Sequence, residues 1–147
     1  MQTFYRDLAK GEDIERKVLN LIHAKYPQAY KIDGYFKEYD IYIPEIKKGI
    51  EVKSDLMSKD TGNIVVEIEF NNKPSALSTT KADYWIWYDG EYITFFKPKD
   101  IHRCIKENNL FYRKFIGKGD VKEKKAYLIK KDMLYKYAIH KKSILWD

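Results

Sequence analysis

The chain has 147 residues, of which 44% are hydrophobic and 34% are charged, which is enough for one packed domain of α and β elements. No apolar run is long enough to cross a bilayer and the start, MQTFYRDLAKGED, is too polar for a signal peptide, so we expect a soluble, cytoplasmic protein without a membrane partner. The single cysteine, Cys104, cannot form a disulfide within the chain, and three scattered histidines leave no Cys/His metal site, so any metal would be held by oxygen.

The first predicted element is an amphipathic helix over residues 11–25, ended by Pro27. The apolar residues at helical spacing are Ile14, Val18, Leu21 and Ile22. Glu15 borders this stripe, because Leu19 and Ile22 follow it at i+4 and i+7. Its carboxylate could therefore point inward, or it could be an ordinary acid of the helix surface.

Two strands are predicted next, near residues 35–43 and 50–54, joined by a Pro-Glu-Ile-Lys-Lys-Gly turn. Because side chains alternate along a strand, Glu51 and Lys53 share one face of the second strand and their apolar neighbours face the other way. If the two strands pair, Asp40 can lie beside Glu51. The pattern thus predicts a cluster of two acids and a lysine.

This cluster predicts a cation site. Two carboxylates brought together repel unless a cation lies between them, and hard oxygen ligands favour Mg²⁺, for which we expect Mn²⁺ to substitute. The ligands would be Asp40, Glu51 and the backbone carbonyl of Val52, which lies between the two functional side chains. The alternative is a solvated face on which Asp40 and Glu51 pair with Lys53 or Lys37.

The rest of the chain alternates between strands and helices. The predicted elements are a strand over 63–70, a short helix over 73–80, a hairpin of 84–88 with 92–96 across Asp89-Gly90, a helix opening at Pro98, a strand near 126–129 and a helix after it. The run YWIWY at 84–88 is interpreted as core, because a strand covered on both faces is continuously apolar. Glu67 and Glu69 alternate on their strand, which is more typical of a solvent face than of a site.

The acids and lysine resemble the motif of the PD-(D/E)xK nuclease superfamily. Asp40, ten intervening residues and Glu51-Val52-Lys53 match its acid, spacer and acid-x-Lys, although Tyr39 and not proline precedes the first acid. In that superfamily a preceding helix often supplies a further acid, here Glu15, with Glu12 as a less favoured substitute. The resemblance covers about residues 11–90. It implies an α/β fold with a restriction-endonuclease-like core, a central mixed β-sheet flanked by helices.

The resemblance also implies a function, a metal-dependent endonuclease that hydrolyses DNA phosphodiester bonds. Such hydrolysis needs an activated water and neutralised phosphoryl oxygens, which carboxylate-held Mg²⁺ can assist. Lys53 would orient the water or stabilise the developing charge, and Glu15 would hydrogen-bond a metal-bound water or help to hold a second ion. The alternatives are a Holliday-junction resolvase of the archaeal type, which works as a homodimer, and a nucleic-acid-binding module that does not cut.

A second similarity is to small phage-encoded nuclease-like proteins of the same superfamily. It rests on the stretches TGNIVVEIEF and KPSALSTTKADYW and implies a phage or mobile-element origin. It marks four substrate-binding candidates, which are Glu67, Ser75, Thr80 and Lys81. Ser75 is better explained as the N-cap of the predicted short helix, and Lys81 could be plain surface.

Positive charge is concentrated late in the chain: residues 1–96 have a net charge of −3 and residues 97–147 of +9. Clustered cations interleaved with aromatic residues suit a phosphate backbone. We therefore expect one nuclease-like domain over 1–147, with a core at about 11–110 and a basic, aromatic-rich C-terminal extension at about 111–147. The lysines expected to contact DNA are Lys118, Lys122, Lys124 and Lys125. The alternative is a solvated lysine-rich surface.

Overall fold

The computed structural model describes residues 2–34, 37–116 and 122–143, with side chains throughout except at 2–10 and 140–143. Over these residues the chain forms a mixed α/β structure of two β-sheets and four α-helices, so the expected fold class is confirmed at that level. No helix in the described part of the chain combines the length and the apolar character that crossing a bilayer requires.

The larger sheet has six strands and is mixed. In spatial order they are β1 (Tyr30–Lys31), β2 (Ile41–Ile43), β3 (Lys48–Ser54), β6 (Tyr84–Tyr88), β7 (Tyr92–Phe96) and β10 (His140–Ser143). β3 and β6 run parallel, and all other neighbours are antiparallel. The predicted hairpin at Asp89-Gly90 is confirmed, because β6 and β7 pair across it. The pairing of β10 with β7 was not predicted.

The smaller sheet is antiparallel. Its strands in spatial order are β5 (Lys73–Pro74), β4 (Asn63–Phe70), β9 (Glu123–Lys130) and β8 (Arg113–Ile116). The strand expected at 63–70 is confirmed, but it belongs to this sheet and not to the central sheet of the expected core. Its Ile64 and Val66 are fully buried and lie opposite Ile129 and Tyr127 of β9. The basic segment after residue 110 therefore supplies two strands of this sheet.

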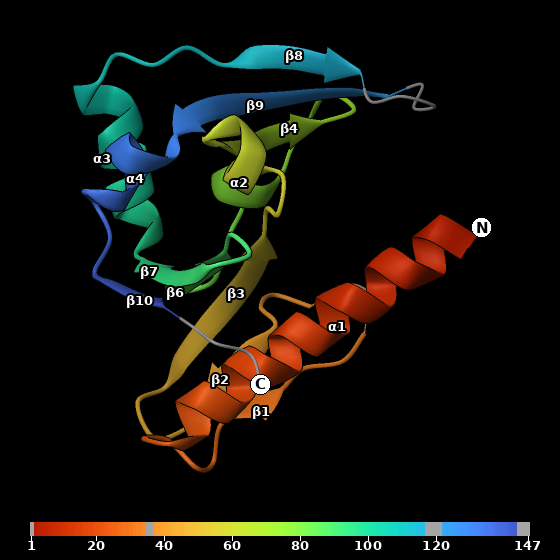
Figure 1. The fold of residues 1–147 in the computed structure, drawn as a ribbon, viewed down its shortest axis with the longest axis vertical. Helices are drawn as coiled ribbons and strands as arrows, with labels where there is room; N and C mark the ends of the chain where they lie inside the picture. The colour runs from red at the N-terminus through yellow and green to blue at the C-terminus, as the bar shows by residue number, and fades with distance from the viewer. Residues whose placement is uncertain (1, 35–36, 117–121, 144–147) are drawn as a thin grey trace.

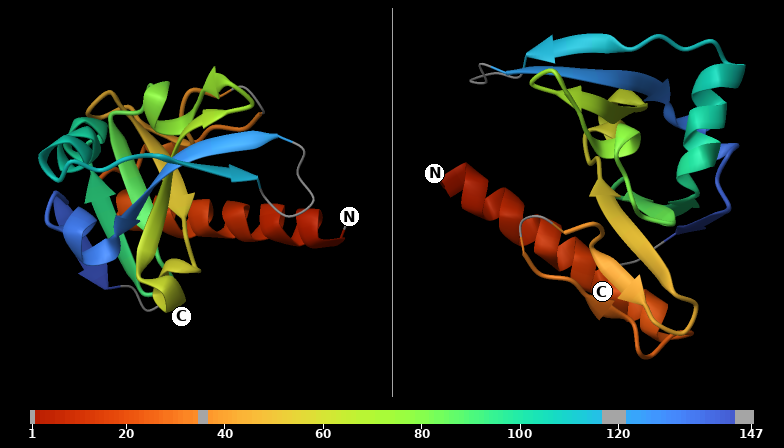
Figure 2. Two further views of the ribbon diagram at one scale, coloured as in Figure 1. Left: turned by 90° about the horizontal axis from the view of Figure 1, so that it is seen from above. Right: turned by 180° about the vertical axis from the view of Figure 1, so that it is seen from behind.

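The helices lie on both sides of the larger sheet. They are α1 (Gln2–His23), α2 (Ser58–Thr61), α3 (Pro98–Glu107) and α4 (Lys131–Tyr135). Figures 1 and 2 show the smaller sheet with α3 and α4 on one side of the molecule and α1 on the opposite side. α1 is longer than predicted, since Gly11 lies inside the helix. It ends at His23, whose Nε2 donates a 2.7 Å hydrogen bond to the carbonyl of Ala29.

Side chains alternate between the two faces of the larger sheet, so that a separate hydrophobic core forms on each face. On β6, Ile86 packs with apolar residues of α1, whereas Trp85 and Trp87 pack with the smaller sheet, α3 and α4. The prediction that this strand is core is confirmed, since all three side chains are at most 3% exposed. By the same alternation, Glu51 and Lys53 of β3 point to the side of the smaller sheet.

The helix predicted over 73–80 is wrong. Asn71 and Asn72 both have positive φ, 51° and 62°, and form a two-residue turn that leads from β4 into β5. Asparagine tolerates this conformation, and turns with two such residues match the twist of a hairpin. Only a short 3₁₀ helix, η1 (Ala76–Ser78), follows.

The strand predicted near 35–43 is shorter than expected. Within the described residues it begins at Ile41, because the residues just before it turn and bring the Lys37 side chain against Asp40. Residues 35–36 lie outside the described part of the chain.

Candidate active site

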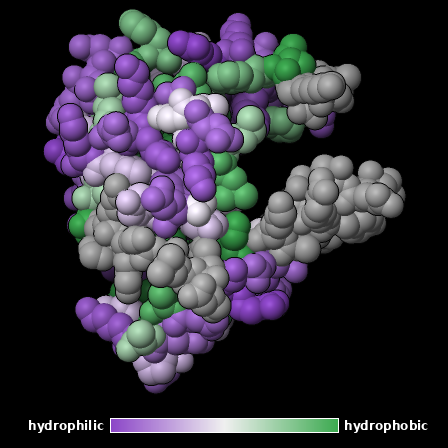
Figure 3. All heavy atoms as spheres, in the orientation of Figure 1, coloured by the Kyte–Doolittle hydropathy of each residue, from purple (hydrophilic) through white to green (hydrophobic). Residues whose placement is uncertain are grey.

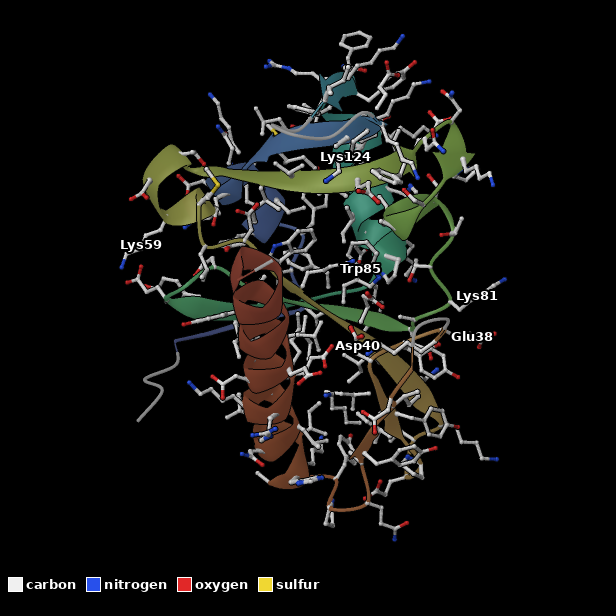
Figure 4. All side chains as sticks on the ribbon, turned by 90° about the vertical axis from the view of Figure 1, so that its right-hand side faces the viewer. Glu38, Asp40, Lys59, Lys81, Trp85 and Lys124 are labelled. Carbon is white, nitrogen blue, oxygen red and sulfur yellow. The ribbon has the colours of Figure 1, made fainter. Side chains whose placement is uncertain are left out.

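A pocket of about 290 Å³ lies where the larger sheet meets the smaller one. Its lining includes Glu51, Lys53, Glu67, Thr80 and Lys81, all singled out from the sequence, together with Lys37, Glu38, Ala76, Thr79 and Trp85. Figure 3 shows hydrophobic side chains, in green, along the right-hand side of the molecule, which Figure 4 views face on. In Figure 4, Lys124 of the smaller sheet, Trp85 and Asp40 follow one another downward, with Lys81 and Glu38 beside them.

Asp40 is 6% exposed and does not itself line the pocket, but it pairs with Lys37, which does. Asp40 precedes β2, next to Ile41, which lies opposite Ile50 of β3, and it is close enough to Glu51 for its charge to raise the pKa of that acid. Its backbone N–H donates to the carbonyl of Ile50 at 2.8 Å, and its Oδ2 accepts a 2.7 Å hydrogen bond from the N–H of Val52. The backbone of β3 therefore fixes this carboxylate.

The orientation of β3 also decides where the carbonyl of Val52 lies. Gly49 and Asp55 use their backbone groups toward the β6 side, whereas Ile50 accepts from Asp40 on the β2 side. The N–H and C=O of one strand residue point to the same side. Since the N–H of Val52 meets Asp40, its carbonyl lies on that side as well.

Lys37 joins two of the predicted acids. Its Nζ lies 3.1 Å from Oδ1 of Asp40 and 3.7 Å from Oε1 of Glu15, while Oε2 of Glu15 lies 3.4 Å from Nζ of Lys31. The side chain of Glu15 is 14% exposed, so it points inward from α1 and not into solvent. The structure thus brings Glu15 and Asp40 around one ammonium group.

Lys53 is held between an acid and an aromatic ring. Its Nζ lies 3.3 Å from Oε1 of Glu51 and 5.4 Å from the centre of the Trp85 ring. The indole N–H of Trp85 donates to Oγ1 of Thr80 at 2.9 Å, which fixes the ring. A cation over an aromatic face is stabilised by the ring quadrupole, so Trp85 helps to position Lys53.

Glu67 enters the pocket because β4 is irregular there. The register with β9 shifts between Glu67 and Glu69, which leaves Ile68 without a position opposite it. Such bulges re-aim side chains. Oε2 of Glu67 accepts a 2.8 Å hydrogen bond from Oγ of Ser75, and Oε1 lies 3.4 Å from Nζ of Lys124. Glu67 is thus partly buried and paired, with 28% of its side chain exposed. Ser75 occupies the N-cap position of η1, as predicted, but its hydroxyl binds Glu67 and makes no capping bond.

The acids share a crowded, partly desolvated environment. Burial and the neighbouring Asp40 raise the pKa of Glu15 above 4.5, against the opposite effect of two lysines. Burial also raises the pKa of Glu51, which Lys53 lowers and Asp40 raises further. Burial alone would lower the pKa of Lys37, but its hydrogen bond to Asp40 and two nearby glutamates raise it above 10.5. Carboxylates whose pKa values are raised in this way are found more often at functional sites than elsewhere.

The oxygen atoms that this site offers as ligands fit a hard cation that keeps several water molecules as its other ligands. Two carboxylates, Asp40 and Glu51, and the carbonyl of Val52 are the oxygen ligands that Mg²⁺ prefers. Among the described residues no cluster of three or more His, Cys, Asp or Glu side chains has the arrangement of a metal site, so waters or substrate oxygens would have to complete the shell.

Of the lysines predicted to contact DNA, Lys124 and Lys125 lie on β9 and Lys122 directly precedes it. Lys125 pairs with Glu69 at 2.8 Å, and Lys122 lies 6.0 Å from the Phe70 ring. Lys118 lies outside the described residues. The ion pairs of Asp40 with Lys37 and of Glu51 with Lys53 are those named in the alternative of a paired face. The sequence pattern did not predict the positioning role of Trp85, which was interpreted as core alone.

The chain was compared with protein-family models, with characterised proteins and with solved structures, and no match was found.

Proposed function

We propose that the protein is a metal-dependent endonuclease that hydrolyses DNA phosphodiester bonds in this pocket. The observation that supports it most is the contact of Asp40 with the backbone of Val52 at 2.7 Å, which joins the first predicted acid to the predicted Glu51-Val52-Lys53 segment. In this proposal α1 and the larger sheet correspond to a restriction-endonuclease-like core, and the smaller sheet is an addition to it.

Each residue has a role that follows from its place. Asp40, Glu51 and the carbonyl of Val52 would hold Mg²⁺, which would supply Lewis-acid stabilisation of the phosphate and a more acidic water. Lys53 lies on the pocket side of β3 and would stabilise charge that develops on the phosphoryl oxygens. Glu15 forms ion pairs with Lys31 and Lys37, and its negative charge would add to the attraction of the cluster for a cation.

The walls of the pocket suit a phosphate-bearing substrate. Lys81 is exposed at its mouth, and Thr79 and Thr80 offer hydroxyl groups beside it. Lys124 reaches into the same region through its ion pair with Glu67. Cations and hydroxyl groups beside an acidic centre are the contacts that position a phosphodiester.

A second candidate function is a nucleic-acid-binding module that does not cut. It is favoured by the pairing of every acid of the cluster with a lysine, which already balances the charge without a metal. The two functions are distinguished by whether the protein cuts DNA when a divalent metal ion is present.

The test is a cleavage assay on labelled duplex, nicked, flapped, branched and single-stranded DNA with Mg²⁺, Mn²⁺, Ca²⁺ or EDTA. We expect cutting with Mg²⁺ or Mn²⁺, binding with little turnover in Ca²⁺, and loss of cutting in Glu51→Gln and Lys53→Ala. Glu45→Gln is the matched control, since Glu45 belongs to another acid-x-Lys segment but is exposed and outside the pocket. Cutting that persists in EDTA or in both active-site variants would rule out the proposal, and binding without cutting on every substrate would favour the second candidate.

A further inference from the structure

Four side chains form a row across the smaller sheet, and we call them the Phe–Lys row. The register places Phe115 of β8 opposite Lys124 of β9, Lys124 opposite Phe70 of β4, and Phe70 opposite Lys73 of β5. Residues directly opposite one another in a sheet share a face. The row therefore alternates ring, cation, ring, cation on one face of the sheet.

Three members of the row are accessible to a ligand, and Phe115 is half-buried. The Phe70 side chain is 38% exposed, Lys73 is exposed, and 42% of the Lys124 side chain is accessible. A further cation, Lys122, lies 6.0 Å from the centre of the Phe70 ring. Phe70 is thus an exposed ring between Lys124 and Lys73, and an aromatic face beside cations is the arrangement on which the bases of a single-stranded nucleic acid stack.

The Phe–Lys row leads to the pocket described above. Nζ of Lys124 lies 3.4 Å from Oε1 of Glu67, and Glu67 lines the pocket together with Glu51 and Lys53. A chain bound along the row would therefore reach the proposed site of hydrolysis from the smaller sheet.

We infer that the Phe–Lys row binds an unpaired stretch of DNA, with bases stacked on Phe70 and Phe115 and phosphates beside the lysines. This inference rests on the proposed function and names the shape of its substrate. Neighbouring strands lie about 4.8 Å apart, so the two rings, which are two strands apart, are separated by about 10 Å. Bases in a duplex are stacked at about 3.4 Å and have no free faces, whereas the bases of an extended single strand can reach both rings.

The test is fluorescence anisotropy of a labelled single-stranded oligomer and of its duplex, in EDTA so that nothing is cut. We expect Phe70→Ala and Phe115→Ala each to weaken single-strand binding about tenfold, and to leave duplex binding within about twofold. The matched control is Ile116→Ala, because Ile116 is next to Phe115 and 66% exposed but points to the other face of β8. Phe70→Trp and Phe115→Trp keep a stacking face and should restore single-strand affinity.

The outcomes separate this inference from the proposed function. Three results would overturn the role of the Phe–Lys row in single-strand binding and leave the nuclease proposal standing. They are equal losses of affinity for single strand and duplex, equal effects of Ile116→Ala and Phe115→Ala, and failure of the tryptophan variants to restore binding. An RNA oligomer of the same sequence bound more tightly than DNA would overturn the choice of DNA. Absence of binding to every nucleic acid would overturn both.

Discussion

The ammonium group of Lys37 lies 3.1 Å from a carboxylate oxygen of Asp40 and occupies the place of a cation among the acids. The same group lies 3.7 Å from Glu15 and contributes to the electrostatic environment of Glu51. Lys37 also lines the pocket, so its side chain has room to leave. A divalent ion that binds Asp40 has to displace it.

We therefore expect Lys37→Met to bind Mn²⁺ several-fold more tightly than the wild type and, without metal, to be less stable by about 1 to 3 kcal/mol. Isothermal titration with Mn²⁺ and thermal unfolding with and without the ion measure the two effects. Lys31→Met is the matched control, because Lys31 pairs with Glu15 and Asp33 but has no ion pair with Asp40 among the described contacts. Equal Mn²⁺ affinities in the two variants would contradict the displacement.

Thr80 is predicted to support Lys53 through Trp85. Its hydroxyl oxygen accepts hydrogen bonds from the indole N–H of Trp85 and the backbone N–H of Ala82, at 2.9 and 3.2 Å. Thr80→Val leaves both donors without this partner, which costs about 1 to 3 kcal/mol of stability and loosens the ring under Lys53. We expect the cleavage rate to fall about tenfold and DNA affinity to fall by less, because Thr79 and Lys81 would still contact the substrate.

Two controls accompany this variant. Thr80→Ser keeps the hydroxyl and should retain the wild-type rate, and Ser78→Ala alters an exposed neighbour on η1 that does not line the pocket. Single-turnover cleavage and DNA anisotropy separate rate from affinity. A wild-type rate in Thr80→Val would show that Lys53 needs no support from the ring.

Local patterns predicted much of the fold. The alternation of residues 63–70, the Asp89-Gly90 turn and Pro98 are short-range signals, and the elements they predicted are present. Sheet membership is a long-range property, however, and nothing in 63–70 indicates that its partner is β9 and not β3. The two-residue turn at Asn71 was missed because the following segment also fits a capped helix.

Asp89 is predicted to make the fold sensitive to acid. It is fully buried, accepts hydrogen bonds from Tyr135 and from the N–H groups of Glu91 and Tyr92, and lies 3.4 Å from Nζ of Lys131. Burial alone would raise the pKa of Asp89, but these partners together lower it below 3.8. Its stabilising effect is therefore fully present above the unfolded value and is lost as the pH falls through the lower folded value.

Asp89→Asn should thus lower the free energy of unfolding near neutral pH by about 1.5 to 3 kcal/mol, and the difference from the wild type should shrink in strong acid. Urea unfolding across the acid range measures it. Asp60→Asn, at an exposed acid of α2, serves as the control and should leave the free energy of unfolding unchanged both near neutral pH and in acid. A constant difference between Asp89→Asn and the wild type at every pH would contradict the electrostatic account.

Gly49 is predicted to be essential to the geometry next to Asp40. A Cβ at this position would overlap the ring of Tyr39, which precedes Asp40 and stacks on Tyr42 at 5.9 Å. Gly49→Ala should therefore destabilise the fold by about 1 to 3 kcal/mol and reduce cleavage. Gly11→Ala should do the opposite, since nothing lies within 4 Å of its added carbon and alanine favours the helix by about 1 kcal/mol. Chemical denaturation measures the free energy of unfolding of both variants. A change of the same sign in Gly49→Ala and Gly11→Ala would contradict the packing argument.

The candidate site was predictable to the extent that it depends on adjacent residues. Strand alternation and the hairpin spacing predicted that the two strands pair and bring Asp40 near the Glu51-Val52-Lys53 segment, and in the structure β2 pairs with β3 and Asp40 accepts a hydrogen bond from the N–H of Val52. The contribution of Lys37 depends on how the chain turns before β2, and that of Glu67 depends on an irregularity in β4, neither of which has a local signature.

The pairing of β4 with β9 has a consequence for how the protein is made. Asn63 lies opposite Lys130, so the part of β4 that does not pair with β5 has no partner strand until the ribosome has released a long intervening stretch of chain. During that interval Ile64 and Val66 face solvent on an unpaired strand, which is the state most prone to aggregate. Glu67 likewise lacks Lys124 until then, so the pocket wall matures late in synthesis. A nascent chain released before β9 has emerged would therefore be a substrate for chaperones and proteases.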